Sequence, residues 1–374
     1  MDSDATDDQK VLLDASVRFM QQVCPLTRVR ERAYSNITYA AEYRRQAGEL
    51  GWFSMLVPED LGGGNVSGNG VLDAALVAYK RGATLQPGPF TGTNVVAHAL
   101  STAGSKEQRQ KVLPALMSGE ASASWAISPP AGHPAMEDGV SAEFRGGACV
   151  LSGCKTFVQD VDESCWLLVT ARSNAGVSQF LVPPGTPAVR VVALDSLDIS
   201  RQFSEVHFEG AQLPASALVG MEGKAFDLVA HQSAIAAVLT AAESVGAMDH
   251  EFEMTLRYAK DRIAFGRPIG SFQAIKHLLA DMSLMLEMSK AITLAAARSL
   301  GSDDGYGLEA ASMAKAFVGD AGVDLAQNCF QIFGGIGFTW EHDQHLYLRR
   351  LTTDAALYGD PAWHRERLCQ LSKL

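Results

Sequence analysis

The chain has 374 residues, of which 47% are apolar and 20% charged, a balance typical of a globular protein with two or three packed units. Its 31 basic and 42 acidic residues give a formal net charge of −11 without a basic run, which argues against binding to nucleic acid or an anionic membrane. The polar, acidic N-terminus lacks a signal-peptide pattern, and no uninterrupted apolar run is long enough to span a membrane. We therefore expect a cytoplasmic protein.

The cysteines and histidines show no spacing typical of metal ligands. There are six cysteines and nine histidines, and no Cys-x-x-Cys pair occurs. We expect reduced thiols and no metal site. The cysteines are Cys24, Cys149, Cys154, Cys165, Cys329 and Cys369.

The first third of the chain shows apolar residues at helical spacing, separated by glycines. This pattern predicts an N-terminal α-helical domain over residues 1–120. The expected helices cover residues 12–20, 41–52, 71–79, 94–100 and 108–117. The intervening segment 57–64 is predicted to be a loop.

From about residue 121 the pattern changes to short apolar or alternating runs bounded by Gly, Pro, Asn and Asp. These runs predict a middle β-barrel domain over residues 121–217. The expected strands cover residues 123–128, 148–151, 166–171, 179–182, 189–194 and 205–208.

Helical spacing returns at about residue 218 and predicts a C-terminal helical bundle over residues 218–374. One long helix should end at the glycine- and proline-containing segment 265–270, and a second should begin near Ser271 as its N-cap. Arg262 and Arg267 then lie at the bend between them. A cationic bend beside free backbone N–H groups suits a pyrophosphate, although both arginines could instead be solvated surface charges.

Two motifs carry a family resemblance. The first is Arg262-x-x-Phe265-Gly266-x-Pro268-Ile269-x-x-Phe272-Gln273. The second is Gln331-Ile-Phe-Gly-Gly-Ile-Gly-Phe338, followed by Glu341-His342 and Leu346-Tyr347-x-Arg349-Arg350. Their sequences and separation resemble the signatures of the acyl-CoA dehydrogenase family. Val57-Pro-Glu-Asp-Leu-Gly-Gly63 and the helix–sheet–helix layout extend the resemblance over the whole chain.

The resemblance implies an α+β multidomain fold with an N-terminal helical domain, a middle β-barrel and a C-terminal four-helix bundle. It also implies FAD-dependent desaturation of an acyl-CoA thioester between Cα and Cβ. In this family a carboxylate removes the α-proton, the β-hydrogen leaves as hydride to the flavin, and electron-transfer flavoprotein accepts the electrons.

In homo-oligomeric members the flavin lies across a subunit boundary. One chain's middle domain holds the ring, and the neighbour's C-terminal bundle holds the adenosine and pyrophosphate. The residues that match the second role are Arg262, Phe265, Gln273, Gln331, Gly334 and Gly335. Without the resemblance, Phe265 reads as a core aromatic and the glycine pair as a helix stop.

The ring-binding segments depart from the family pattern. The usual Thr-Glu-Pro-x-x-Gly-Ser-Asp loop is replaced by residues 125–134, which keep Ser128 but lack the acidic and Ser-Asp positions. In the next segment an aromatic survives at Phe157, but Gln159 replaces the threonine whose hydroxyl bonds the flavin.

The catalytic base is also displaced. Gly359 occupies the position of the usual glutamate, and Asp360 follows it. Asp360 could act as the base, or it could simply order the turn before Pro361. Other members place the base, and a nearby arginine, on the long helix, where this chain has Ala236 and Ala237. Glu243 is the only carboxylate in that part of the helix, and we interpret it as structural or interfacial.

Two hypotheses follow. The chain is a homo-oligomeric, FAD-dependent acyl-CoA dehydrogenase with Asp360 as a displaced base, or it is the partner of a related, base-bearing chain in an α2β2 assembly. The second resembles heteromeric actinobacterial enzymes of fatty-acid or steroid side-chain catabolism. A flavin-free scaffold is a third option.

Overall fold

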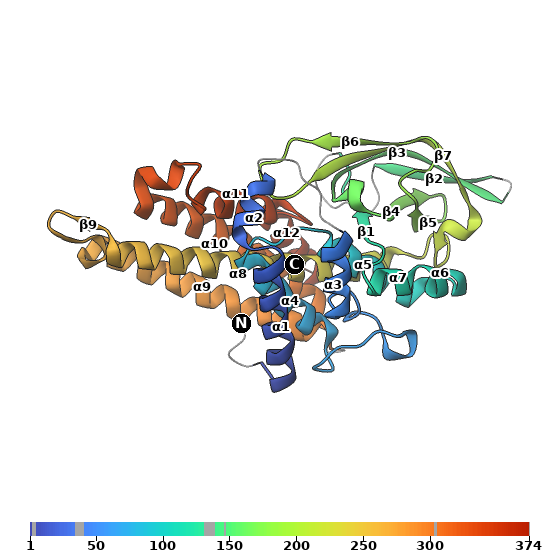
Figure 1. The fold of residues 1–374 in the computed structure, drawn as a ribbon. Helices are drawn as coiled ribbons and strands as arrows, with labels where there is room; N and C mark the ends of the chain where they lie inside the picture. The colour runs from blue at the N-terminus through green and yellow to red at the C-terminus, as the bar shows by residue number, and fades with distance from the viewer. Residues whose placement is uncertain (2–4, 34–40, 131–138, 146, 303–304, 374) are drawn as a thin grey trace.

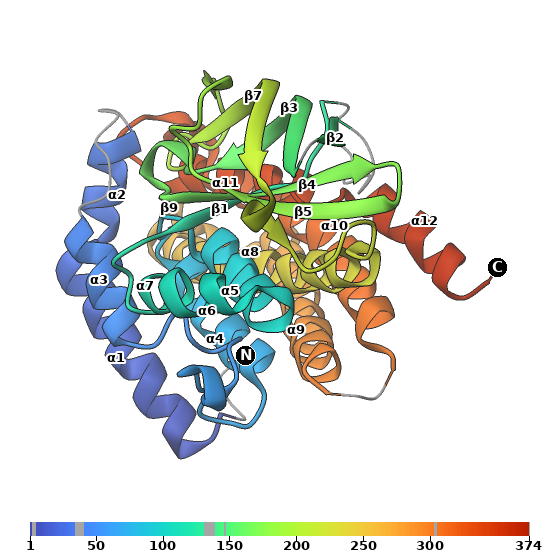
Figure 2. The same cartoon turned by 90° about the vertical axis from the view of Figure 1, so that its right-hand side faces the viewer.

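The computed structural model describes residues 1, 5–33, 41–130, 139–145, 147–302 and 305–373. A β-sheet lies against one side of a helical body, and long C-terminal helices extend away from the sheet to a narrow tip (Figure 1). Figure 2 shows the sheet spread across the top of the helices. Three segments, the first helical, the second β and the third helical, follow one another along the chain, as the sequence predicts.

The N-terminal helices cover the expected segments. They are α1 (Asp7–Val23), α2 (Leu26–Ala33), α3 (Ala41–Glu49), α4 (Gly70–Ala83), α5 (Phe90–Ala103), α6 (Lys106–Lys111) and α7 (Leu113–Met117). The single helix expected over 108–117 is instead two, because Pro114 lies in the first turn of α7 and cannot donate a backbone N–H to α6. The sequence analysis also missed α2, which has only one fully buried residue, Val29.

The middle part of the chain forms one mixed, eight-stranded sheet in the order β6-β7-β3-β2-β4-β5-β8, with β1 paired in parallel to β4. The strands are β1 (Ala123–Ala126), β2 (Val140–Arg145), β3 (Ala148–Gln159), β4 (Trp166–Ser173), β5 (Gly176–Val182), β6 (Val189–Leu194), β7 (Phe203–Pro214) and β8 (Leu218–Val219). The strands β2 and β8 were not predicted. The helical pattern predicted from about residue 218 begins only at Phe226, since β8 and a turn come first.

The C-terminal part contains three long helices and two shorter ones. They are α8 (Phe226–Asp261), α9 (Gln273–Leu300), α10 (Gly307–Phe333), α11 (Gln344–Ala356) and α12 (Pro361–Leu371). By length and composition α8 could span a membrane, but 89% of its most apolar stretch is buried inside the protein, as expected of a core helix. The buried face of α8 packs against α4 and α10.

Two hydrophobic cores hold the molecule together. One is shared by the N-terminal and C-terminal helices and includes Trp52, Leu100 and Leu239. The other lies within the sheet and includes Phe180 and Val206. The two helical regions therefore form one packed body. The predicted domain boundaries after residues 120 and 217 remain predictions.

Candidate functional site

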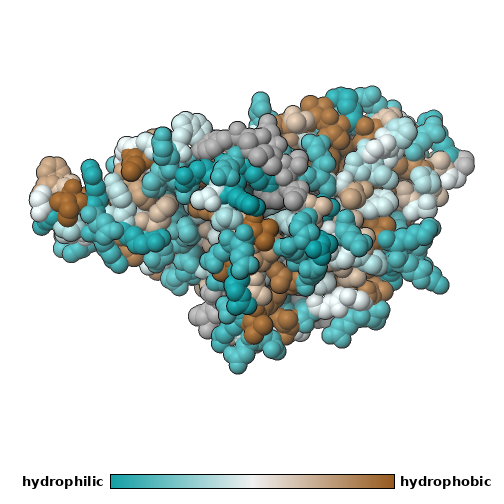
Figure 3. Space-filling model, viewed as in Figure 1, coloured by the Kyte–Doolittle hydropathy of each residue, from teal (hydrophilic) through white to brown (hydrophobic). Residues whose placement is uncertain are grey.

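The predicted bend between α8 and α9 is a short hairpin at the tip of the molecule. It is formed by β9 (Ile263–Ala264) and β10 (Arg267–Pro268), with Phe265 and Gly266 in left-handed conformations between them (Figure 1). Phe265 is 96% exposed, so it is not the core aromatic of the alternative interpretation. Figure 3 shows apolar surface gathered at this tip.

Arg262 follows the last residue of α8 and is exposed to solvent. Among the described residues, none forms a hydrogen bond or an ion pair with its guanidinium. Arg267, in contrast, stacks on Phe272, with 4.1 Å between the guanidinium carbon and the ring centroid. The predicted N-cap at Ser271 is wrong: α9 begins at Gln273, and the Ser271 hydroxyl donates to the Pro268 carbonyl at 2.7 Å.

The second motif lies at the same end of the helices (Figure 1). Gly334 ends α10 with φ 62° and ψ −139°, a conformation that favours glycine, and Gly335 follows in the 3₁₀ helix Gly334–Phe338. A Cβ at either glycine would meet no described atom within 4 Å. The ring of Phe333, next to them, packs on Tyr258 of α8 with centroids 4.7 Å apart. The two motifs thus share one open end of the bundle, where Gln273 and Gln331 are also exposed.

A cavity of about 440 Å³ lies between the sheet and the segment joining α11 to α12. Phe157, Leu197 and Leu357 give it an apolar wall, and Ser128 and Asp360 provide polar groups. No residue of the hairpin lines this cavity. The end of α11 that borders it packs near the middle of α8, where Ser244 donates to Asp354, whereas Arg262 follows the last residue of α8. The structure therefore does not bring Arg262 and Asp360 together.

The turn that carries Asp360 is fixed from several sides. Lys315 of α10 is fully buried and donates to the carbonyls of Ala355 and Gly359 at 2.9 and 3.0 Å. Burial lowers the pKa of Lys315 to about 8. The indole of Trp125 stacks on Tyr358, with centroids 5.8 Å apart. This packing defines where the Asp360 side chain lies.

Asp360 is the N-cap of α12. Its Oδ1 accepts from the Trp363 backbone N–H at 2.7 Å, and among the described residues nothing bonds its other oxygen. Gly359 has φ 105°, and a Cβ there would lie 2.6 Å from the Trp363 ring and 2.8 Å from Nε2 of His364. A glutamate at position 359 would therefore clash, so the local packing requires the glycine.

The altered ring-binding segment is the end of β3. Phe157 is 49% exposed with φ 51° and lines the cavity, whereas Gln159 donates to the Asp160 carboxylate at 2.9 Å. Lys155 turns inward and donates to the Ile127 carbonyl at 2.8 Å. Ser128 is described, but residues 131–134 of the preceding loop lie outside the described residues.

Ala236 and Ala237 of α8, which the resemblance aligns with a base and an arginine, are fully buried. The Glu243 carboxylate accepts hydrogen bonds from Arg81 Nε, at 3.2 Å, and from Arg201. It is thus a buried structural carboxylate, as interpreted from the sequence.

None of the buried ion pairs around Glu243 was predicted from the sequence. Arg201 also pairs with Asp354, and Arg350 Nε donates to Asp198 at 2.6 Å. Burial alone would raise the pKa of Asp198, but Arg350 and Arg201 bring it below its usual value. No local pattern marks these residues, because their partners are distant in the sequence.

A second cavity of about 640 Å³ was also missed. It lies between α5, α8 and the loop after α3. His98 and His231 face each other across part of it, with ring centroids 5.2 Å apart. Burial and the neighbouring His231 lower the pKa of His98 to about 4, so both rings are neutral at pH 7.

Comparison with known proteins gives a consistent result. A family model described as "Acyl-CoA dehydrogenase, C-terminal domain" matches residues 225–370, and one described as "Acyl-CoA dehydrogenase, N-terminal domain" matches residues 6–120. The chain is 34% identical over 302 residues to acyl-CoA dehydrogenase FadE34 of Mycobacterium tuberculosis, and this covers 80% of the chain but only 38% of that protein.

A second relative, an acyl-CoA dehydrogenase of Bacillus subtilis, is 29% identical over 355 residues, which cover 88% of this chain and 92% of that protein. Among solved structures, a chain of the ChsE4-ChsE5 complex from Mycobacterium tuberculosis superposes with a TM-score of 0.88. That match is 26% identical and covers the whole of both chains.

Proposed function

This chain belongs to the acyl-CoA dehydrogenase family, whose members are flavoprotein oxidoreductases acting on CH–CH bonds, and we propose that it serves FAD-dependent α,β-dehydrogenation of an acyl-CoA as one subunit of a tetramer. The observation that carries the proposal is the separation of two half-sites. The tip presents open glycine backbone and Arg262, which pairs with no described residue, whereas the cavity that holds Asp360 is lined by none of these residues. Two such chains are needed to complete one site.

The residues at the tip fit the nucleotide part of FAD. The Arg262 guanidinium pairs with pyrophosphate, and Phe265 offers an exposed ring for the adenine side. The open space at Gly334 and Gly335 lets a ligand approach the backbone, and Gln273 and Gln331 provide exposed amides beside it.

When bound, FAD supplies the acceptor for the β-hydrogen. The chain's own contribution is a largely apolar cavity that excludes water, and a carboxylate. Asp360 uses Oδ1 to cap α12 and keeps its other oxygen for the α-proton of the thioester. In this role Asp360 replaces the usual glutamate, for which the packing around position 359 leaves no room.

A second candidate function is that of a partner subunit that lacks a base and only completes the flavin site of a related chain. The close packing around Gly359 favours it, since a carboxylate cannot stand at the usual position. The Gln159 side chain, which replaces the threonine of the family pattern, donates to Asp160, and this favours it further. The match to a chain of the ChsE4-ChsE5 complex is in keeping with a heteromeric assembly.

Asp360→Asn separates the two functions. Asparagine is as good an N-cap as aspartate, so α12 and flavin binding should be preserved. If Asp360 is the base, turnover of acyl-CoA falls by roughly 10²–10⁴-fold at unchanged FAD content. Full activity of the variant in the assembled protein would exclude Asp360 and leave the partner-subunit function.

The assembly itself is tested by purifying the chain alone and together with a related chain, and measuring FAD per chain. The partner-subunit function predicts little flavin and activity in the chain alone, and a yellow, active complex on co-purification. An active homotetramer would contradict it, and a colourless complex would support a flavin-free scaffold. The acyl group, from fatty-acid or steroid side-chain breakdown, the use of electron-transfer flavoprotein as acceptor and the cytoplasmic location remain predictions.

A further inference from the structure

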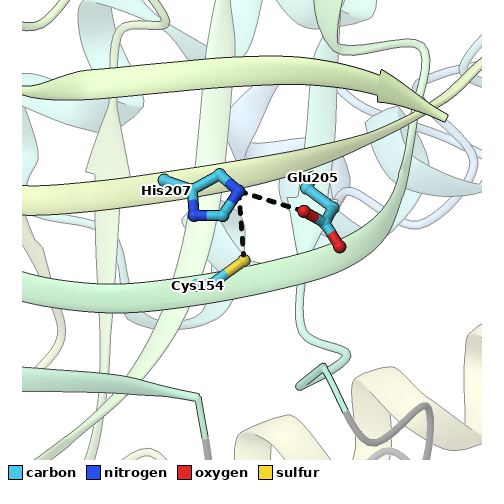
Figure 4. Close-up of side chains that lie close together, drawn as sticks. All are labelled: Cys154, Glu205 and His207. Atoms are coloured by element: carbon cyan, nitrogen blue, oxygen red, sulfur yellow. Dashed lines mark hydrogen bonds and ion pairs between the residues drawn. The ribbon is translucent and has the colours of Figure 1, made fainter.

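Three side chains with metal-binding atoms converge on the outer face of the sheet (Figure 4). Cys154 lies on β3, and Glu205 and His207 lie two residues apart on the neighbouring strand β7. Cys154 and His207 are directly paired across the two strands. Because alternate residues of a strand face the same side, Glu205 joins them on that face. The thiol, one carboxylate oxygen and one imidazole nitrogen all lie within 4.8 Å of one another.

The geometry is not that of a Cys-His-Glu catalytic triad. In a triad the acid and the nucleophile contact opposite nitrogens of the imidazole. Here Cys154 Sγ lies 3.8 Å from His207 Nε2, and Glu205 Oε2 lies 3.0 Å from the same nitrogen. A single N–H can serve only one of them well. A sulfur, an oxygen and a nitrogen donor that point toward a common centre are instead the arrangement that binds a cation.

Two of the three distances are close to those of a tetrahedral zinc site. With Zn–S near 2.3 Å and Zn–N and Zn–O near 2.1 Å, the tetrahedral edges are about 3.6 Å for sulfur to nitrogen and about 3.4 Å for nitrogen to oxygen. The observed separations of 3.8 and 3.0 Å differ from these values by a few tenths of an ångström. The third separation, between the Cys154 sulfur and the Glu205 oxygen, lies within 4.8 Å, against about 3.6 Å in a tetrahedral site.

Charge and exposure also fit. A thiolate, a carboxylate and a neutral imidazole carry a charge of −2, which balances a divalent cation. The side chains of His207 and Glu205 are 26% and 34% exposed, so water can reach a fourth coordination position. Arg190 is the cross-strand neighbour of His207 on β6, but its guanidinium pairs with Glu209 at 3.2 Å. The other nearby cation, Lys155, points into the protein and bonds the Ile127 carbonyl.

We propose that Cys154, Glu205 and His207 form a Zn²⁺ site, with a water molecule as the fourth ligand. On binding, the Cys154 thiol releases its proton to solvent and three protein–metal bonds form, without redox change. The spacing of cysteines and histidines along the chain predicted no metal site. Here the set is completed across two strands, and only the Glu-x-His pair is local.

The position of the site suggests what the metal does. The pairing of β3 with β7 is irregular between Lys155 and Val158, and Glu205 lies opposite this bulge. The bulge carries Phe157, which lines the cavity between the sheet and α11. A metal bound to Cys154 on β3 and to Glu205 and His207 on β7 would link the two strands. The link lies beside the bulge that carries Phe157.

Cobalt(II) is the probe for the test, because a cysteine ligand gives it a sulfur-to-metal charge-transfer absorption. We expect the purified full-length protein, freed of metal with a chelator, to bind one Co²⁺ per chain with this absorption and to release it to added Zn²⁺. Cys154→Ser should abolish the absorption. Cys165→Ser, which removes an exposed thiol elsewhere in the sheet domain, should leave it unchanged.

Two outcomes would overturn the site: no charge-transfer absorption in the parent protein, or an absorption that survives Cys154→Ser. If Cys154→Ser does not fold, Glu205→Gln keeps the shape of a partly exposed side chain and should weaken Co²⁺ binding at least about tenfold. As a second measurement, Zn²⁺ should raise the thermal midpoint of the parent but not of the variant. An equal rise in both would contradict the proposal. All these measurements are independent of FAD and turnover.

Discussion

The molecule has two groups of arginines in opposite situations. Inside the protein, Arg81, Arg201 and Arg350 are buried and paired with carboxylates. At the hairpin tip, Arg262 is exposed and unpaired among the described residues. The first group is complete within one chain, whereas the second becomes complete only with a ligand. The comparison separates residues that hold the fold from residues that are available for binding.

The buried group joins all parts of the molecule. Arg81 comes from α4, Glu243 from α8, Asp354 from α11, and Arg201 from the connection between β6 and β7. A buried charge is costly without its partner, so each member depends on the others. Arg262 at the tip has no such dependence, since water already solvates its guanidinium when no ligand is bound.

The largest expected effect comes from breaking the buried group. Glu243→Ala leaves Arg81 and Arg201 without a shared carboxylate, and we expect the free energy of unfolding to fall by about 3–5 kcal/mol. Urea unfolding followed by circular dichroism measures this loss. Glu253→Ala, at an exposed position on the same helix, is the matched control and should change stability by less than about 0.5 kcal/mol. Equal losses in the two variants would mean that the ion pairs add nothing beyond an ordinary surface charge.

Substitution at the tip should lower ligand affinity and leave stability unchanged. Arg262→Ala removes a charge that pairs with phosphate, worth about 1.5–3 kcal/mol, or roughly a 10–100-fold loss of FAD affinity. Stability of the flavin-free protein should not change, because no described residue forms a hydrogen bond or an ion pair with the guanidinium. Fluorescence titration of the assembled apoprotein with FAD measures the affinity.

Arg257→Ala is the control for that experiment, since Arg257 is an exposed arginine on the same helix, one residue before Tyr258. It should bind FAD like the parent. An unchanged FAD affinity in Arg262→Ala would show that Arg262 does not contribute to nucleotide binding. The difference between the buried arginines and Arg262 would then not reflect a difference in function.

The sequence predicted the tip better than the interior, and the reason is physical. The bend between α8 and α9 follows from local signals, since Gly266, Pro268 and Gly270 interrupt a helical pattern. The buried ion pairs join residues such as Arg201 and Asp354, which are 153 positions apart, and no periodicity reports such a partner. The clash that excludes a side chain at Gly359 likewise depends on Trp363 and His364 packing around the turn. Strand β2, in contrast, carries a local signal, the alternating sequence Val-Ser-Ala-Glu-Phe-Arg, and was overlooked.

Asp160 shares features with both groups: it is buried like the interior arginines and their carboxylates, but no arginine among the described residues bonds to it. Burial and the neighbouring Glu163 raise its pKa to about 7. Between about pH 4 and pH 7 the folded protein therefore retains a proton that the unfolded chain releases, and stability falls as the pH rises through this range. The contribution of one such group is at most about 1.4 kcal/mol per pH unit.

Asp160→Asn should remove this contribution and flatten the dependence of the unfolding free energy on pH between 4 and 7. Asparagine tolerates the left-handed φ of 54° at this position and keeps the hydrogen bond from Gln159 through its side-chain oxygen. The exposed Asp162 provides the matched control, and Asp162→Asn should leave the slope close to that of the parent. A slope that is unchanged in Asp160→Asn would mean that Asp160 is already charged at low pH. In that case a nearby cation such as Arg201 or Arg32 would be compensating it, and Asp160 would belong with the paired interior.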